Sequence, residues 1–134
     1  MRYMLLIYGD EKDREALSAE ELQKSMDQAQ AVMVEANRCG VFEGADALLS
    51  TGIATTLRKH EGKVVFTDGP FAETKEQLGG YIILDCRDLD EALDWAAKFP
   101  RACGGIGCVE VRPIREIPGF GKKHEMSAAQ DVHG

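Results

Sequence analysis

Long apolar runs are absent from this 134-residue sequence, and none approaches the roughly 20 residues that a membrane-spanning helix needs. The apolar N-terminal run from Met1 to Tyr8 is too short for a signal peptide, and no small-residue cleavage site follows it. Acidic residues follow instead, at Asp10, Glu11 and Asp13. We interpret the run as a first β-strand and expect a cytoplasmic protein with no membrane partner.

Basic clusters are also scarce. Lys and Arg number 16 against 23 Asp and Glu, which gives a formal net charge of −7. The nearest approach to a basic cluster is Arg58-Lys59-His60, and Glu61 follows it at once. Because contacts to phosphates require a basic face, these features exclude nucleic acid as a partner.

Metal-binding and cofactor motifs are missing as well. The four cysteines form no Cys-x-x-Cys pair and have no histidine at a metal-finger offset; they are Cys39, Cys86, Cys103 and Cys108. The glycine run from Gly104 to Gly107 lacks the strand–helix setting of a dinucleotide site. We therefore expect no metal and no cofactor. Cys103 and Cys108 flank the glycine run, so a thiol redox sensor stays open as a hypothesis.

The chain length fits a single domain, and the apolar patterns predict its elements. Two segments are apolar on both faces, as in strands that are covered on both sides: Tyr3–Tyr8 and Gly79–Cys86. Another strand is predicted at about 45–50, where Gly44 and Gly52 leave its limits undefined. A partly solvated edge strand is predicted at Cys108–Ile114, where apolar and charged residues alternate. A hairpin is predicted from 53–59 and 63–67 around Gly62, and a charged loop after the first strand.

Two helices are predicted from their caps and apolar stripes. Ser18 and Glu21 form a capping box, and Gly40 is the expected stop of the first helix. Asp88 caps the second helix, and Pro100 closes it. The buried stripes are expected to be Leu22, Met26, Ala29, Met33 and Ala36 in the first helix, and Leu89, Ala92, Leu93, Ala96 and Phe99 in the second.

The resulting order is β-α-β, a hairpin insertion, then β-α-β, which predicts an α+β, ferredoxin-like domain over residues 1–117. Residues 118–134 are polar and without pattern, so we expect a poorly ordered tail. Two helices cover only one face of a four-stranded sheet. We expect the other face to be covered by a second copy, giving a homodimer built as a dimeric α+β barrel. The alternative is that the tail or the hairpin folds over that face.

The densest chemistry lies in the stretch from Thr67 to Tyr81, which contains Asp68-Gly69-Pro70-Phe71. By itself, Asp68-Gly69 predicts a turn. As a whole string, the stretch closely resembles the DGPF motif of the YCII-related family. The start at 1–10, the run from Asp88 to Ala97 and the ending from Val109 to Ile114 also resemble family segments.

That resemblance implies a ferredoxin-like fold and a dimeric α+β barrel. The wider superfamily includes a dehydrochlorinase and resembles muconolactone isomerases, and a His–Asp pair has been suggested as catalytic in other members. This sequence departs from that pattern, since its histidines are His60, in the hairpin turn, and His124 and His133, in the tail. The DGPF branch is often encoded beside sigma factors, which implies a regulatory setting.

Our first functional hypothesis is a small-molecule-binding protein, either a ligand binder or a cofactor-independent lyase or isomerase with Asp68 as the general base. Glu73 or Glu76 would supply a second carboxylate, and Lys75 or Arg58 would hold an anionic substrate. Phe71 and Tyr81 would shape the pocket, which Tyr8 and Asp10 would also face. The alternative is a non-catalytic regulator that contacts a protein partner, for example a sigma factor, through the acidic face at 88–94. A buried Asp68 lining a closed cavity with Phe71 would favour the first hypothesis, whereas an Asp68 satisfied entirely by its own turn, with no cavity nearby, would favour the second.

Overall fold

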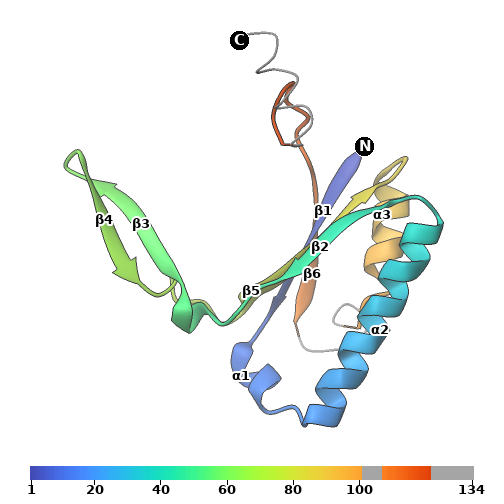
Figure 1. Ribbon diagram of the computed structural model, residues 1–134, viewed down its shortest axis with the longest axis horizontal. Coiled ribbons are helices and arrows are strands. Elements are labelled where there is room, and N and C mark those ends of the chain that lie inside the picture. Colours follow the sequence, from blue (N-terminus) through green and yellow to red (C-terminus); the bar gives the residue numbers. More distant parts are fainter. Residues whose placement is uncertain (101–106, 122–134) are drawn as a thin grey trace.

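The computed structural model describes residues 1–100 and 107–121. Figure 1 shows a sheet with helices on one side and a long two-stranded arm that projects from one end. The helices are α1 (Glu11–Glu15), α2 (Ala19–Arg38), the 3-10 turn η1 (Thr51–Ile53) and α3 (Leu89–Ala96). The strands are β1 (Arg2–Gly9), β2 (Phe42–Ala47), β3 (Thr55–His60), β4 (Lys63–Asp68), β5 (Gln77–Asp85) and β6 (Cys108–Pro113).

The main sheet is antiparallel with the strand order β2-β5-β1-β6, and β3 and β4 form a separate two-stranded sheet. The two strands that are apolar on both faces, β1 and β5, are therefore the central pair, as the sequence predicts. The α+β, ferredoxin-like βαβ-βαβ arrangement with a hairpin insertion is confirmed by this order. Both α2 and α3 cover the same face (Figure 1).

The core lies between that face and the two helices. Alternate residues of the central strands point into it and are nearly fully buried; they are Tyr3 and Leu5 from β1, and Ile82 and Leu84 from β5. The helices contribute Ala36, Ala92, Trp95 and Ala96. Burial of these side chains supplies most of the stabilisation, at about 25 cal/mol for each Å² of apolar surface removed from water.

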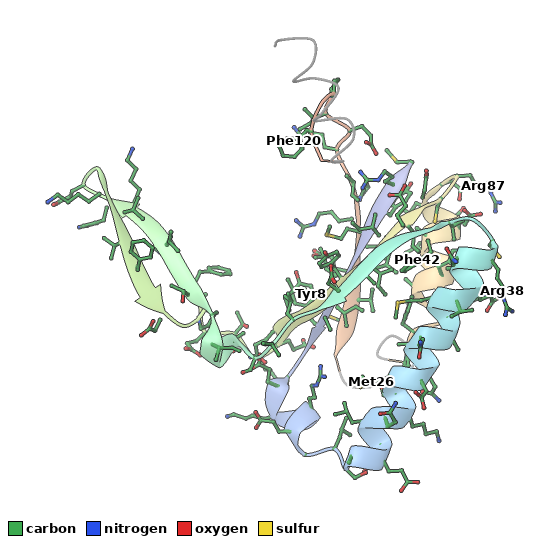
Figure 2. The ribbon with its side chains drawn as sticks, in the orientation of Figure 1. Tyr8, Met26, Arg38, Phe42, Arg87 and Phe120 are labelled. Atoms are coloured by element: carbon green, nitrogen blue, oxygen red, sulfur yellow. The ribbon has the colours of Figure 1, made fainter. Side chains whose placement is uncertain are left out.

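The predicted helix stripes are correct only in part. Met26, in the N-terminal half of α2 (Figure 2), is 53% exposed. The core is packed against the C-terminal half of α2 instead, where Ala29, Met33 and Ala36 lie. In α3, Leu89 and Leu93 are both 46% exposed. The bulky Trp95 takes the buried position instead, which turns those leucines towards solvent.

One element prediction was wrong, and the bounds of another differ in the structure. The expected charged loop after β1 contains the short helix α1, because the Asp10 carboxylate accepts a hydrogen bond from the Lys12 N–H and caps it. The second strand runs from Phe42 to Ala47 rather than over 45–50. It starts directly after the turn at Gly40, since Phe42 and Ala45 pack against the core.

The predicted hairpin is confirmed, with Glu61 and Gly62 at φ of 50° and 80° in its two-residue turn. We call residues 48–76, which carry η1, β3 and β4, the arm. Every residue of β4 is exposed, and the arm points away from the sheet (Figure 1). The hairpin therefore does not fold over its own sheet, which removes one of the two alternatives to a second copy.

The expected edge strand at the C-terminal end is confirmed as β6, in which Val109 and Val111 pack against the core. Cys103, the run from Gly104 to Ile106 and the tail from 122 onward, with His124 and His133, lie outside the described residues. Within the described part of the chain, no helix combines the length and apolar character that crossing a membrane requires.

Candidate functional site on the open face of the sheet

The face of the main sheet opposite the helices, which we call the open face, has an apolar centre. The strand register places six side chains there in facing pairs: Met4 with Ile83, Leu6 with Tyr81, and Tyr8 with Leu78. All six are half-buried, because each is sheltered by its neighbours on the central strands. Successive side chains of a β-strand point to opposite faces of the sheet. Because the alternate residues of β1 and β5 point into the core, these residues lie on the open face.

One edge of the open face carries a tyrosine–carboxylate pair on β1 and β6. The Tyr8 hydroxyl donates to Glu110 Oε1 at 3.3 Å, and Arg112 Nη2 donates to the same oxygen at 2.8 Å. Partial burial, and after it the nearby Glu110 carboxylate, raise the pKa of Tyr8. Tyr8 is therefore held as a neutral hydrogen-bond donor at this edge.

The other edge carries a second pair, on β5 and β2. The Tyr81 hydroxyl donates to Asp46 Oδ2 at 2.5 Å, and the two residues face each other in the strand register. This hydrogen bond is the main reason that the pKa of Tyr81 is raised. The open face thus has an apolar centre with a phenol and a carboxylate on each flank.

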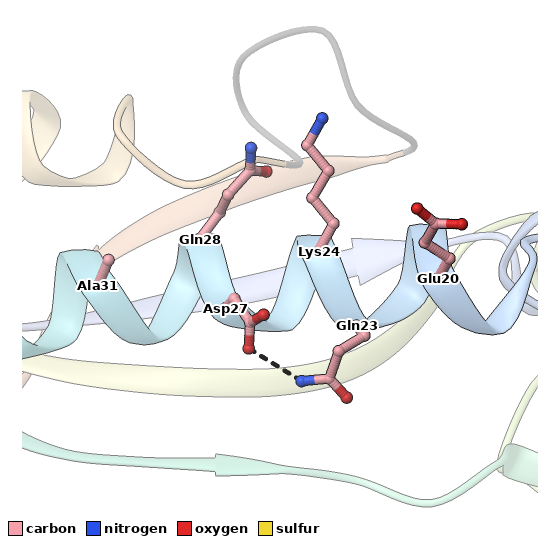
Figure 3. A pocket seen from close by; sticks show the side chains of 6 residues that line it. All are labelled: Glu20, Gln23, Lys24, Asp27, Gln28 and Ala31. Atoms are coloured by element: carbon pink, nitrogen blue, oxygen red, sulfur yellow. Dashed lines mark hydrogen bonds between the residues drawn. The ribbon is translucent and has the colours of Figure 1, made fainter.

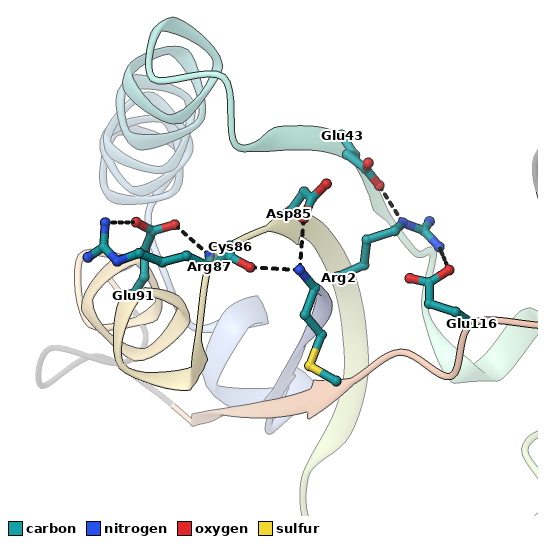
Figure 4. Close-up of polar contacts among 8 residues, drawn as sticks. Arg2, Glu43, Asp85, Cys86, Arg87, Glu91 and Glu116 are labelled. Atoms are coloured by element: carbon teal, nitrogen blue, oxygen red, sulfur yellow. Dashed lines mark hydrogen bonds and ion pairs between the residues drawn. The ribbon is translucent and has the colours of Figure 1, made fainter.

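Ion pairs gather at the end of the sheet where the chain begins (Figure 4). Arg2 Nε lies 2.6 Å from Glu43 Oε2, and Arg2 Nη1 lies 3.8 Å from Glu116 Oε2. The hydrogen bond with Glu43 raises the pKa of Arg2. The terminal ammonium of Met1 lies 3.2 Å from Asp85 Oδ1. These charges bound the apolar centre at one end and have a structural role.

The residues predicted around the Asp68 turn lie on the arm, and Figure 2 shows Tyr8 on the sheet, away from it. Asp68 ends β4, faces Thr55 and is exposed. The predicted turn is present, with Gly69 at a φ of 101°, which favours glycine. In a single chain Asp68 therefore does not line a closed cavity.

Other contacts hold that turn together. The Gly69 N–H donates to the Ala54 carbonyl at 2.7 Å, and the Thr56 hydroxyl donates to the Gly69 carbonyl at 2.8 Å. Arg58 Nη2 donates to the Phe71 carbonyl at 3.2 Å, so Arg58 braces the loop. Phe71 is 74% exposed.

Of the remaining predicted site residues, Glu73, Glu76 and Lys75 are exposed on the arm. Asp10 lies at the end of β1 but is used as the cap of α1. Among the eight residues predicted as base or ligand contacts, Tyr8 and Tyr81 are the two that lie on the open face.

Sequence reasoning missed three polar residues of the open face: Asp46, Glu110 and Arg112. The alternation along β6 did place Glu110 and Arg112 on one face, and that face was interpreted as solvated. Only the register across β1 and β6 reveals that Glu110 meets Tyr8.

Glu11 was also missed. Its carboxylate accepts hydrogen bonds from the Thr51 N–H at 2.8 Å, the Thr51 hydroxyl at 3.0 Å and the Ser50 hydroxyl at 3.2 Å. These bonds, that of the Thr51 N–H first, lower the pKa of Glu11. Glu11 thereby ties α1 to the root of the arm.

A shallow polar hollow lies along the solvent side of α2 (Figure 3). It is lined from that one helix, by Glu20, Gln23, Lys24, Asp27, Gln28 and Ala31. The Gln23 amide donates to Asp27 Oδ1 at 2.9 Å, which satisfies both groups. One exposed helix face does not enclose a ligand, so we assign no site here. The residues that the structure describes contain no cluster of His, Cys, Asp and Glu able to hold a metal ion.

Together, the fold and the open face define a ferredoxin-like α+β domain in which residues 1–100 and 107–121 leave one face of the main sheet uncovered. The model of the YCII-related domain matches residues 1–118, and the chain belongs to that family. The family resemblance noted from the sequence is therefore confirmed.

One relative is an uncharacterised protein of Rhizobium meliloti (strain 1021), which is 42% identical over 114 residues, covering 85% of this chain and 92% of the relative. A similar solved structure is 5-chloro-2-hydroxyhydroquinone dehydrochlorinase (TftG) from Burkholderia phenoliruptrix in complex with 2,5-dihydroxybenzoquinone. It has 13% identity and a TM-score of 0.47, and the match covers 87% of this chain and 96% of that one.

Proposed function

We propose that this protein is a homodimeric small-molecule-binding protein whose site lies on the open face, at the seam between two copies. The observation that carries the proposal is the pair of tyrosine–carboxylate contacts, Tyr8–Glu110 and Tyr81–Asp46, on either side of one apolar centre. An apolar surface ringed by directed polar groups is typical of ligand sites. Face-to-face packing of two open faces would enclose it as a dimeric α+β barrel.

The lining indicates the class of ligand. Leu6, Met4 and Ile83 provide a flat apolar floor, so a compact ring is favoured over a flexible chain. The phenols donate hydrogen bonds and the carboxylates accept them, which suits hydroxyl or oxo substituents on the ring. Glu110 is already paired with Arg112, so no excess positive charge selects an anion on this edge.

Acid–base chemistry is the reaction class that these groups support. A carboxylate such as Asp46 can take a proton from the ligand, and a neutral tyrosine can donate one at another atom. The net change is an isomerisation, or an elimination when a leaving group departs. Asp68, the general base expected from the sequence, acts here only if a second copy encloses it.

A non-catalytic regulatory protein is the second candidate. The observation that favours it is the apolar surface of the arm, where Phe66 is 67% and Phe71 is 74% exposed. Such a surface suits protein contacts, for example with a sigma factor. The cytoplasmic location and the assignment of 118–134 as an appended tail stay predictions.

A thermal-shift screen with small hydroxylated and oxo-substituted ring compounds tests the proposal, because a ligand that binds the folded state alone raises its melting temperature. The wild type is compared with Tyr81→Phe, and with Tyr3→Phe as the matched control, since Tyr3 points into the helix-covered core. We expect Tyr81→Phe to lose most of the ligand-induced shift and Tyr3→Phe to keep it. Asp68→Asn is run in parallel, and loss of the shift in that variant alone would place the site on the arm instead.

If no compound of this class shifts the wild type, or if Tyr81→Phe and Tyr3→Phe respond equally, the open-face site is wrong. A protein partner that binds the arm, with no small-molecule response, would favour the regulatory candidate.

A further inference from the structure

The exposed apolar side chains of this protein are concentrated on the arm. Among the described residues, more than half of the large apolar side chains that are exposed lie between positions 48 and 71. They are Leu48, Leu49, Ile53, Leu57, Val64, Val65, Phe66 and Phe71. Monomeric proteins rarely expose contiguous apolar patches of this kind, so the concentration indicates a surface that is covered in the working assembly.

The hairpin register separates these side chains into two faces. Leu57 faces Phe66, and Lys59 faces Val64 on the same side, with Thr55 and Asp68 at the base. We call this side the apolar face of the arm. The opposite side carries Thr56, Arg58, Val65 and Thr67, and is largely polar. Only one side of the hairpin is therefore suited to docking.

The root of the arm is braced, although the hairpin itself touches little else. Glu11 holds Ser50 and Thr51, and the Gly69 N–H donates to the Ala54 carbonyl at 2.7 Å. A two-stranded hairpin is only marginally stable by itself, and three or more strands or a packed face are needed to hold it. The arm therefore has a fixed root and a hairpin with no support from its own chain's sheet. An arm that docks on another molecule requires this combination.

Charge indicates what that molecule is. The tip from Arg58 to Lys63 carries three basic residues and one acidic residue, in a chain whose formal net charge is −7. Outside this tip the chain has 13 Lys and Arg against 22 Asp and Glu, and one edge of the open face carries Asp46, whose hydrogen-bond partner, the Tyr81 hydroxyl, is neutral. The basic tip is therefore complementary to the acidic body of a second copy of this chain.

We propose that each arm lays its apolar face on the body of a second copy, beside the partner's open face, so that two copies exchange arms about a two-fold axis. This inference rests on the homodimer of the proposed function and adds that the arm is the element that stabilises the dimer. Asp68 shares the apolar face with Phe66 and Leu57. Docking therefore carries Asp68 from the surface to the seam, so that each site includes a carboxylate from the other copy.

Sedimentation equilibrium on the full chain tests the arm exchange. Phe66→Ser removes the largest side chain of the apolar face, and Val65→Ser is the matched control on the opposite face of the same strand. In a symmetric dimer both arms dock, so two copies of the Phe66 side chain are buried at the interface. Because both lose their apolar contact in Phe66→Ser, we expect this variant to raise the dimer Kd at least about 100-fold. We expect Val65→Ser to change it by less than about threefold. Both variants should keep the circular-dichroism spectrum of the wild type, because β4 is exposed in the single chain.

Hydrogen exchange on the wild type gives a second readout. We expect the amides of β3 and β4 to exchange more slowly at concentrations where the dimer forms than after dilution to monomer. A Phe66→Ser variant that dimerises like the wild type, with no concentration-dependent protection of the arm, would overturn the exchange while leaving the sheet-face dimer intact. Equal weakening by both substitutions would overturn the face assignment. A wild type that stays monomeric at high concentration would overturn the exchange together with the dimer of the proposed function.

Discussion

The link between Glu11 and the root of the arm allows a quantitative prediction. The Glu11 carboxylate accepts three hydrogen bonds, two from Thr51 and one from Ser50. Glu11→Gln keeps the shape of the side chain and one acceptor oxygen but removes the negative charge that strengthens these bonds. We predict that this variant is less stable and that its arm is less firmly held.

The magnitude follows from the geometry. A hydrogen bond to a charged group contributes about 1.5–3 kcal/mol in favourable cases. Glu11 is half-buried and partly screened by water, and glutamine can still accept from the Thr51 N–H, so only a fraction of this is lost. We expect a loss of about 1 kcal/mol, which lowers the melting temperature by roughly 3–5 °C for a chain of this length.

The effect should depend on pH in a defined direction. Because the folded state lowers the pKa of Glu11, its stabilisation is complete above the ordinary carboxylate range and is lost as the pH falls through the lowered pKa. The stability difference between wild type and Glu11→Gln should therefore be full at about pH 7 and shrink as the pH falls below the ordinary glutamate pKa of 4.5. Urea unfolding at several pH values measures it, at one fixed protein concentration because dimerisation also stabilises the fold.

The control is Asp13→Asn, which removes the same charge from the same first turn of α1 at an exposed position. Both substitutions weaken the favourable interaction with the helix N-terminus. If the two variants give the same stability at every pH, the hydrogen bonds to the arm root contribute nothing and the reasoning is refuted. Faster hydrogen exchange around η1 in Glu11→Gln, but not in Asp13→Asn, is the expected result.

Three further predictions concern the sheet and its thiols. A Cβ added at Gly80 would lie 2.8 Å from the Asp46 carbonyl oxygen, so Gly80→Ala should force β2 outward and cost about 1–3 kcal/mol in urea unfolding; unchanged stability would contradict the close approach. Asp46→Asn should lower the pKa of Tyr81 towards its ordinary value of 10.0, as followed by tyrosinate absorbance, and a pKa that does not fall would count against the hydrogen bond. Burial raises the pKa of the Cys86 thiol to about 11. At about pH 8 this thiol should therefore react with iodoacetamide far more slowly than the exposed thiol of Cys39. Equal reaction rates would refute the burial of Cys86.

The element order was predictable because its signals are local. The Ser18–Glu21 capping box forms as expected, with the Glu21 N–H donating to the Ser18 hydroxyl at 3.0 Å. The Asp88 cap likewise accepts from the Glu91 N–H at 2.9 Å. The boundaries of β2 were missed because the packing of Phe42 and Ala45 against the core sets them. The helix α1 was missed although its cap at Asp10 is also a local signal.

The candidate site was predictable only in its tyrosines. Tyr8 and Tyr81 lie on strands whose double apolar pattern placed them correctly at the sheet centre. Their carboxylate partners come from positions 102 and 35 residues away, Glu110 and Asp46. Nothing in the neighbourhood of either tyrosine indicates those partners, because they meet only through the strand register.

The sequence by itself determined the ferredoxin-like order, the central position of β1 and β5 and the hairpin, because periodicity, caps and turn residues act over a few neighbouring positions. The family was identified from the resemblance of whole segments, such as Thr67–Tyr81, to known members. Only the tertiary structure decided that the hairpin stands away from the sheet as an arm, and that Asp68 is carried out with it while Asp46 and Glu110 join the open face. These outcomes depend on which strands pair and in which register, and that is set by the simultaneous packing of residues far apart in the chain.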